Sequence, residues 1–164
     1  MLILKIRTDF VTNSSSSSFI LGFKNKDTRT AEINADINNL GYDKLDENIL
    51  KLLYDVNNAK SLLIPYILMS YKEGIRVDVQ RYVNDNNNPY ERYSNEWFDY
   101  CRTSEFNNLC NNKINENVVN FKKVIEENDY KDFVLLTYSD HDNSELEHQI
   151  CPHLKNTIAT ISHH

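Results

Sequence analysis

A near-continuous apolar run at residues 133–138 constrains the fold of this chain more than any other segment. A strand with one wet face alternates apolar and polar residues, whereas a strand buried on both faces reads as an unbroken apolar run. Residues 133–138 are therefore predicted to form a buried central strand. The chain must then supply other strands and helices to surround it.

Four further segments are predicted to be strands. Residues 2–7 and 18–23 are short and rich in apolar and β-branched side chains, and residues 157–161 have the same character near the end of the chain. Residues 75–80 alternate apolar with polar side chains, which is typical of a strand with one wet face. Together these segments predict a mixed sheet of about five strands.

Apolar residues at helical spacing fill the middle of the chain. A helix is expected over residues 43–57 with Asp43 or Asp46 as its cap, and another over residues 61–72, bent or begun by Pro65 and stopped by Gly74. A further amphipathic helix is expected over residues 118–125. The expected fold is a single domain over residues 1–164, α/β or α+β, with a helical middle section.

An aromatic face lies between the loop at residues 85–89 and the helix at 118–125. Its members recur at roughly helical spacing, with an interruption near Thr103 and Ser104 where a new N-cap is expected: Tyr90, Tyr93, Trp97, Phe98, Cys101 and Phe106. Core packing is the favoured interpretation. The alternative is a docking face for a protein partner, which requires Tyr93, Trp97 or Phe98 to be exposed.

Charge and hydropathy exclude several classes of protein. The net charge of −6 opposes general nucleic-acid binding, which needs a basic surface to neutralise phosphates. No signal-length apolar core follows Met1, and the longest apolar run, residues 62–69, is too short for a membrane span and contains Pro65. A cytoplasmic protein without membrane contact is expected.

All five histidines fall in the last 24 residues, among acidic side chains and one cysteine. The cluster consists of His141, His148, His153, His163 and His164 with Asp140, Asp142, Glu145, Glu147 and Cys151. Imidazole and carboxylate groups bind divalent metals and transfer protons near neutral pH. The cluster is therefore the strongest pointer to chemistry in the sequence.

The order of the elements predicts where this cluster gathers. If the strand at 133–138 and the last strand run parallel, the residues that follow each of them meet at one edge of the sheet. The expected ligands of a divalent ion (Zn, Mn or Mg) are Asp140, Asp142, His148, His163 and His164. The residues expected to act as the base that activates water are Glu145, Glu147 and His141. No EF-hand or HExxH spacing is present.

A second group of candidates lies near the N-terminus. Backbone N–H groups and hydroxyls of a serine run, with one guanidinium, suit a small anionic ligand, and the expected anion-binding residues are Arg7, Asn13, Ser14, Ser15 and Ser16. The run lacks the glycines and lysine of a P-loop. A flexible loop and a modification target remain open alternatives.

The segment FVTNSSSSSF at residues 10–19 resembles an N-terminal segment shared by uncharacterised proteins of low-GC Gram-positive bacteria and their phages. Some of these proteins also have a Ser-Asp-x-Asp turn, a Glu-His pair and a terminal His-His, which match residues 139–142, 147–148 and 163–164 here. The resemblance implies that the serine segment and the terminal histidines are family features. It implies no established activity.

Three functions follow as hypotheses. The first is a small divalent-metal-binding protein, which in its more specific form is a metal-dependent hydrolase of a phosphorylated or nucleotide-like substrate. The second is a non-enzymatic interaction protein of phage or mobile-element origin that binds a host protein through the aromatic face. The third is a regulatory domain in which the histidines pack as a pH-sensitive cluster. A solvated acidic surface without chemistry is the plain alternative to all three.

Overall fold

The computed structural model describes residues 4–5, 16–42, 46–59 and 61–163 of the chain. The helices are α1 (Arg29–Asn39), α2 (Glu47–Asn58), α3 (Ile64–Gly74), α4 (Arg76–Asn87), α5 (Asn95–Tyr100), α6 (Ser104–Glu127) and α7 (Asp140–Glu145). Three short turns of helix are η1 (Lys26–Thr28), η2 (Leu146–Ile150) and η3 (Cys151–His153). The strands are β1 (Leu4–Lys5), β2 (Ser16–Phe23), β3 (Asp132–Ser139) and β4 (Thr157–His163).

The described strands form one small sheet in the order β1-β4-β2-β3. Its three long strands are antiparallel, and only the two-residue β1 pairs in parallel, with β4. The prediction of an α/β or α+β domain with a five-stranded mixed sheet is therefore wrong. The described part of the chain is 64% helical, and its sheet is a minor component.

One of the predicted strands is a helix. Residues 75–80 lie at the start of α4, where Ile75, Val79 and Val83 are buried at a spacing of four residues while Val77 is exposed. The alternation of Ile75, Val77 and Val79 is therefore incidental to the fold. The buried stripe follows the helical period, because α4 packs along α6 rather than beside a strand.

The strand expected at the centre of the sheet lies at its edge. β3 pairs with β2 along its whole length, and on its other side the amide of Leu62 donates to the carbonyl of Phe133 over 3.3 Å. Leu135 and Thr137 are exposed. Val134, Leu136 and Tyr138 are buried against α1, α2 and η2, whereas on the opposite face of β3 only Phe133 is buried, so the apolar run does not reflect a central position in the sheet.

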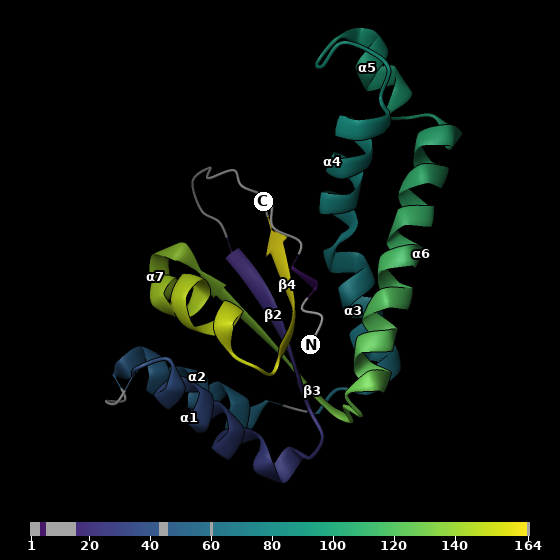
Figure 1. Cartoon of the computed structure of the whole chain (residues 1–164). Helices are drawn as coiled ribbons and strands as arrows, with labels where there is room; N and C mark the ends of the chain where they lie inside the picture. Colours follow the sequence, from purple (N-terminus) through teal and green to yellow (C-terminus); the bar gives the residue numbers. More distant parts are fainter. Residues whose placement is uncertain (1–3, 6–15, 43–45, 60, 164) are drawn as a thin grey trace.

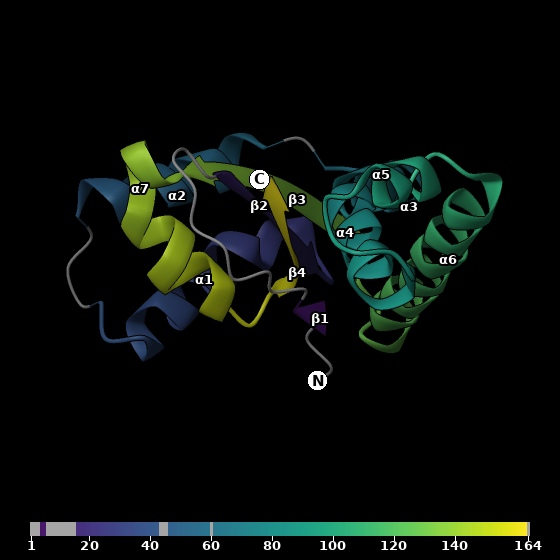
Figure 2. The same cartoon turned by 90° about the horizontal axis from the view of Figure 1, so that it is seen from above.

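The sheet separates two hydrophobic clusters. Phe19 and Leu21 of β2 face α1, α2 and η2, whereas Ile20 faces α3, α4 and α6. Figures 1 and 2 show these two helical groups on opposite sides of the sheet. Because successive side chains of a strand point to opposite faces, the apolar run of β2 contributes to both clusters at once.

Helices α4 and α6 form an arm that extends beyond the sheet to α5 at its outer end (Figure 1). α6 is a single helix that begins at the expected cap Thr103, whose hydroxyl accepts from the amide of Phe106 over 3.2 Å. The separate helix expected at 118–125 is its C-terminal part. At the base of the arm, the rings of Tyr71 and Phe121 stack with centroids 4.1 Å apart.

Several local predictions are confirmed. The strands expected at 18–23 and 157–161 lie within β2 and β4, and Asp46 caps α2 by accepting from the amide of Ile49. Of the strand expected at 2–7, only Leu4 and Lys5 are described, and they form β1.

Helix α1 was not predicted from the sequence, since Ile33 and Ile37 are its only buried apolar residues. None of the described helices has the length and apolar character needed to cross a lipid bilayer.

Candidate functional site

The C-terminal ends of β3 and β4 meet at the same end of the sheet. β3 and β4 both run antiparallel to β2, so their C-terminal ends lie beside the start of β2, where Ser16 is opposite Ser139 on one side and His163 on the other. We call these three residues the strand-end row. β1 runs parallel to β4 and therefore points toward the same end of the sheet. The backbone register thus brings an expected anion-binding residue, Ser16, next to an expected metal ligand, His163.

A buried carboxylate lies beside this row. The side chain of Glu147 is almost fully buried, and its Oε1 accepts a hydrogen bond of 2.7 Å from Oγ of Ser17, the residue after Ser16. Burial of a carboxylate is costly unless hydrogen bonds replace water, so this contact stabilises its position. Glu147 belongs to η2, a π-helical turn of a kind that frequently occurs at functional sites. Of the three expected bases, Glu147 has a described hydrogen bond near the row, to Ser17, whose side chain points to the face of the sheet opposite that of Ser16.

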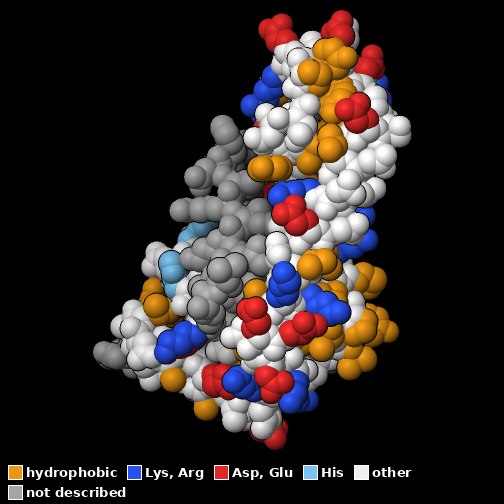
Figure 3. Space-filling model, turned by 45° about the vertical axis from the view of Figure 1, so that its right-hand side comes forward, with side chains coloured by type: hydrophobic (Ala, Val, Ile, Leu, Met, Phe, Trp, Pro, Cys, Tyr) orange, Lys and Arg blue, Asp and Glu red, His pale blue; other side chains and the backbone are white. Residues whose placement is uncertain are grey.

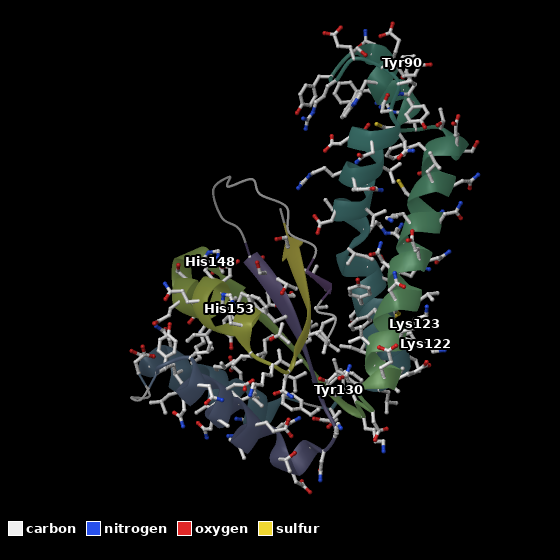
Figure 4. All side chains as sticks on the ribbon, viewed as in Figure 1. Tyr90, Lys122, Lys123, Tyr130, His148 and His153 are labelled. Carbon is white, nitrogen blue, oxygen red and sulfur yellow. The ribbon has the colours of Figure 1, made fainter. Side chains whose placement is uncertain are left out.

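The neighbouring candidates do not gather around Glu147 as a set. The exposed ring of His148 has Nε2 3.9 Å from Oε2 of Glu147, and His153 is exposed on η3 (Figure 4). Glu145 lies instead near Tyr42, whose pKa is raised by burial and further by the charge of Glu145. The described side chains of the histidine cluster are therefore spread along one segment.

Cys151 is a core residue. It is fully buried in the cluster beneath η2, and burial raises the pKa of its thiol, with a further contribution from the charge of Glu147. Only the thiolate is an effective nucleophile or metal ligand. A thiol held in its protonated form is suited to packing and not to chemistry.

The expected metal and anion sites are only partly covered by the structure. Within the described residues, no three His, Cys, Asp or Glu side chains are gathered so that they could hold a metal ion. The side chains of Asp140, His141, Asp142 and His163 lie outside the described part of the chain, as do the whole of His164, Arg7, Asn13, Ser14 and Ser15. The metal set and the anion site stay predictions.

A second candidate site is an aromatic cluster at the outer end of the arm. It consists of Tyr90, Tyr93, Trp97 and Phe98, which we call the aromatic tip. Tyr90, Tyr93 and Phe98 are 47%, 66% and 44% exposed, and Trp97 is partly buried between its neighbours. The ring of Trp97 lies 5.4 Å from that of Tyr93 and meets the ring of Phe98 edge-on at 4.8 Å. The rings of Tyr93, Trp97 and Phe98 are therefore connected to one another, and Tyr90 is an exposed aromatic side chain of the same segment.

The same aromatic face also supplies a core. Tyr100 and Phe106 are buried and meet edge-on with centroids 5.8 Å apart, within the cluster that fills the arm and its base. Tyr90 contacts Tyr100 at 6.1 Å and so links the exposed rings to the buried ones. The aromatic face is therefore buried in the core at Tyr100 and Phe106 and exposed at the tip.

One asparagine organises the backbone of the tip. The side-chain nitrogen of Asn88, Nδ2, donates to Oδ1 of Asn84 over 2.8 Å and to the carbonyl of Trp97 over 3.2 Å. Oδ1 of Asn88 accepts from the backbone amide of Tyr90 over 3.0 Å. The hydroxyl of Ser94 caps α5 by accepting from the amide of Trp97. These bonds hold the loop between α4 and α5 in one arrangement, so the exposed rings are presented on a fixed backbone.

Tyr93 has a backbone conformation that is unusual for its type. Its φ of 69° lies in the left-handed region, where a residue other than glycine is strained by about 1 kcal/mol or more. Such strain persists only where the surroundings impose it, and it concentrates at functional sites. The strained turn directs the most exposed ring of the tip outward.

Sequence reasoning missed two features of the surface. Asn88 was assigned only to a loop, although an asparagine before a proline is a common turn signal. It also missed an apolar patch on α3, formed by Leu63, Ile64, Tyr66 and Met69, all of which are exposed. The signal was present in the run at 62–69, which is apolar all round and cannot be buried on every side by one neighbour.

Comparison of the chain with models of protein families, with curated proteins and with solved structures gave no match.

Proposed function

We propose that this chain is a non-enzymatic protein-interaction module that docks on a partner protein through the aromatic tip. The observation that carries the proposal is the exposure of Tyr93 and Phe98, whose rings both contact that of Trp97, together with the exposed Tyr90 of the same segment. Burial of large exposed aromatic side chains in an interface is favourable because it removes their apolar surface from water. Aromatic side chains also contribute much of the binding energy of protein interfaces.

The position of the tip supports this function. Figure 4 places Tyr90 at the outer end of the arm, while Lys122 and Lys123 lie near its base. The buried rings of Tyr100 and Phe106 anchor the outer end to the arm. A partner can therefore approach the tip without contacting the sheet. Because the tip backbone is already fixed by Asn88, binding costs less conformational entropy than it would for a flexible loop.

The tip contains the sole tryptophan of the chain, which provides a direct assay. Proteins captured from an extract of the source organism on the immobilised chain are purified and titrated against it while Trp97 emission is recorded. A bound partner is expected to shift the emission of Trp97. The double variant Tyr93→Asn/Phe98→Ala is expected to weaken binding at least about thirtyfold, since the loss of even one interface ring of this kind costs about 2 kcal/mol.

The variants are chosen to separate binding from folding. Asparagine tolerates the positive φ of position 93, so that substitution removes the ring without adding strain. Tyr66→Ala is the matched control, because Tyr66 is 57% exposed but lies in the α3 patch. Equal capture of one partner by the double variant, Tyr66→Ala and the unaltered chain would contradict the proposal, as would a partner that binds without any change in Trp97 emission.

A divalent-metal site at the strand-end row, with hydrolysis of a phosphorylated or nucleotide-like substrate, is a second candidate function. Its support is the register that sets Ser16 beside His163 and the buried carboxylate of Glu147 next to Ser17. The proposed ligands are those expected from the sequence, with Glu147 as the base. Hydroxyl groups of the row would orient the anionic part of the substrate.

Metal analysis tests this second candidate. After incubation with Zn²⁺, Mn²⁺ or Mg²⁺ and removal of excess ion, the unaltered chain is expected to retain about one equivalent of one metal, and His163→Ala to lose it. His153→Ala removes an exposed histidine on η3 and should retain the metal. The absence of any retained ion in the unaltered chain would remove this candidate without affecting the docking proposal.

A further inference from the structure

The aromatic tip carries an excess of negative charge. Residues 85–105 contain five carboxylates, from Asp85, Glu91, Glu96, Asp99 and Glu105, against two guanidinium groups, from Arg92 and Arg102. The net charge of this segment is −3, half of the −6 of the whole chain. Figure 3 shows acidic side chains around the hydrophobic ones at the end of the arm that carries α5. The exposed rings therefore have an acidic rim.

The arginines of the tip neutralise only two of these carboxylates. Arg92 lies 3.8 Å from Asp85, and Arg102 lies 3.3 Å from Asp99. Among the residues that the structure describes, no Lys, Arg or His side chain forms an ion pair with Glu91, Glu96 or Glu105, and all three are exposed. These three carboxylates remain available to a cationic group on a partner.

One cation of the chain itself, the guanidinium of Arg92, already lies on an aromatic ring of the tip. The guanidinium carbon of Arg92 lies over the ring of Tyr93, 5.1 Å from its centroid, and the same side chain contacts the carboxylate of Asp85. A cation over an aromatic face is attracted by the negative charge of the ring face, and a nearby carboxylate adds to this attraction. Glu96 is a further exposed carboxylate of the same segment, next to Trp97 in sequence on α5.

We propose that the partner segment bound by the aromatic tip is basic, with Arg or Lys side chains that lie on the exposed rings and pair with Glu91 and Glu96. This inference rests on the proposed docking function and adds the chemistry of the partner. The charge argues against other occupants of the tip. Phosphate groups of nucleic acid or of an anionic membrane are repelled by the acidic rim, and a second copy of the chain would bring two such rims together.

A peptide titration tests the charge of the partner. The probes are short peptides of alternating Gly and Arg, their Gly-Glu counterparts, uncharged Gly-Ser peptides and a single-stranded oligonucleotide, each followed by Trp97 emission. The Gly-Arg peptide is expected to bind and the other three not to. Binding should weaken as NaCl is raised from about 0.05 to 0.5 M, because salt screens exposed charges.

Variants of the acidic rim provide the second measurement. Glu91→Gln/Glu96→Gln is expected to weaken binding of the Gly-Arg peptide about threefold to tenfold, the range for two exposed ion pairs. Glu47→Gln/Glu127→Gln removes two exposed carboxylates outside the tip and is expected to bind like the unaltered chain. This control separates a local effect from a change in net charge.

The outcomes distinguish the two proposals. Equal binding of the Gly-Arg and Gly-Glu peptides, binding of the oligonucleotide, or full binding by Glu91→Gln/Glu96→Gln would overturn the basic-partner inference while leaving docking at the tip intact. If Tyr93→Asn/Phe98→Ala binds both the Gly-Arg peptide and the captured partner as tightly as the unaltered chain, docking at the tip itself fails. Loss of peptide binding in both tip variants, with the control unchanged, supports both proposals.

Discussion

Arg29→Ala is expected to lower the free energy of unfolding by about 3–5 kcal/mol. Arg29 and Asp132 form an ion pair with Nη1 3.0 Å from Oδ2, and their side chains are only 3% and 7% exposed. The other guanidinium nitrogen donates to the carbonyl of Ala59 over 3.0 Å. Oδ1 of Asp132 has no hydrogen-bond partner among the described residues, so loss of Arg29 would leave this carboxylate buried and uncompensated. Urea unfolding followed by circular dichroism measures the change.

The contacts of Arg29 join three parts of the chain, so their loss is expected to destabilise the whole fold. Arg29 begins α1, Asp132 begins β3, and Ala59 ends α2, so one guanidinium fixes both helices against the sheet. Arg102→Ala breaks an exposed pair with Asp99 and should change stability by less than about 0.5 kcal/mol. A loss below about 1 kcal/mol for Arg29→Ala would show that the buried pair is compensated in some other way.

Local signals predicted the ends of elements well. The sequence offered Asp43 or Asp46 as one N-cap and placed another near Thr103 and Ser104, and Asp46 and Thr103 each accept a hydrogen bond from the amide three residues later. A cap depends on residues within one turn of helix, so its signal is complete in the sequence. The strands at 18–23 and 157–161 were found for a similar reason, because residues adjacent in sequence carry the pattern.

The assembly of the elements depends on contacts that no local pattern contains. Ile75, Val77 and Val79 satisfy a strand pattern and a helix pattern equally over six residues, and packing of α4 along α6 decided between them. The position of β3 at the sheet edge depends likewise on β2 pairing with both β3 and β4. The three long strands were therefore predicted from the sequence, but the number of strands in the sheet and the central position of β3 were predicted wrongly.

The two candidate sites differ in how far the sequence could define them. β3 and β4 run in the same direction, so their C-terminal ends meet as the sequence predicted, but the pairing of Ser16 with Ser139 and His163 was not predicted, because the serine run was assigned to a loop. For the aromatic tip, the sequence named the rings but could not assign them to core or surface. Tyr100 and Phe98 lie on the same helix, yet Tyr100 is buried and Phe98 exposed, which depends on how α5 packs and not on the spacing of the rings.

Gly22→Ala is expected to lower the free energy of unfolding by about 1–3 kcal/mol. A Cβ at this position of β2 would lie 2.8 Å from Cδ2 and 2.9 Å from Cγ of Tyr130. The strand cannot easily move away, because the amide of Gly22 donates to the carbonyl of Asn156 and its carbonyl accepts from Nδ2 of Asn156, each over 2.9 Å. Restriction of the unfolded chain by alanine stabilises by only about 0.4–1 kcal/mol, so the collision decides the sign.

A double-mutant cycle identifies the collision as the cause. In a Tyr130→Ala background, the cost of Gly22→Ala is expected to fall by at least about 1 kcal/mol, since the ring that meets the new methyl group is gone. Gly41→Ala, at a φ of 90° with nothing within 4 Å of the added carbon, should cost the same in both backgrounds. An unchanged cost for Gly22→Ala would refute the collision. Tyr130 joins the end of α6 to β3, so this contact sets how closely the base of the arm lies on the sheet, and with it the direction in which the aromatic tip is presented.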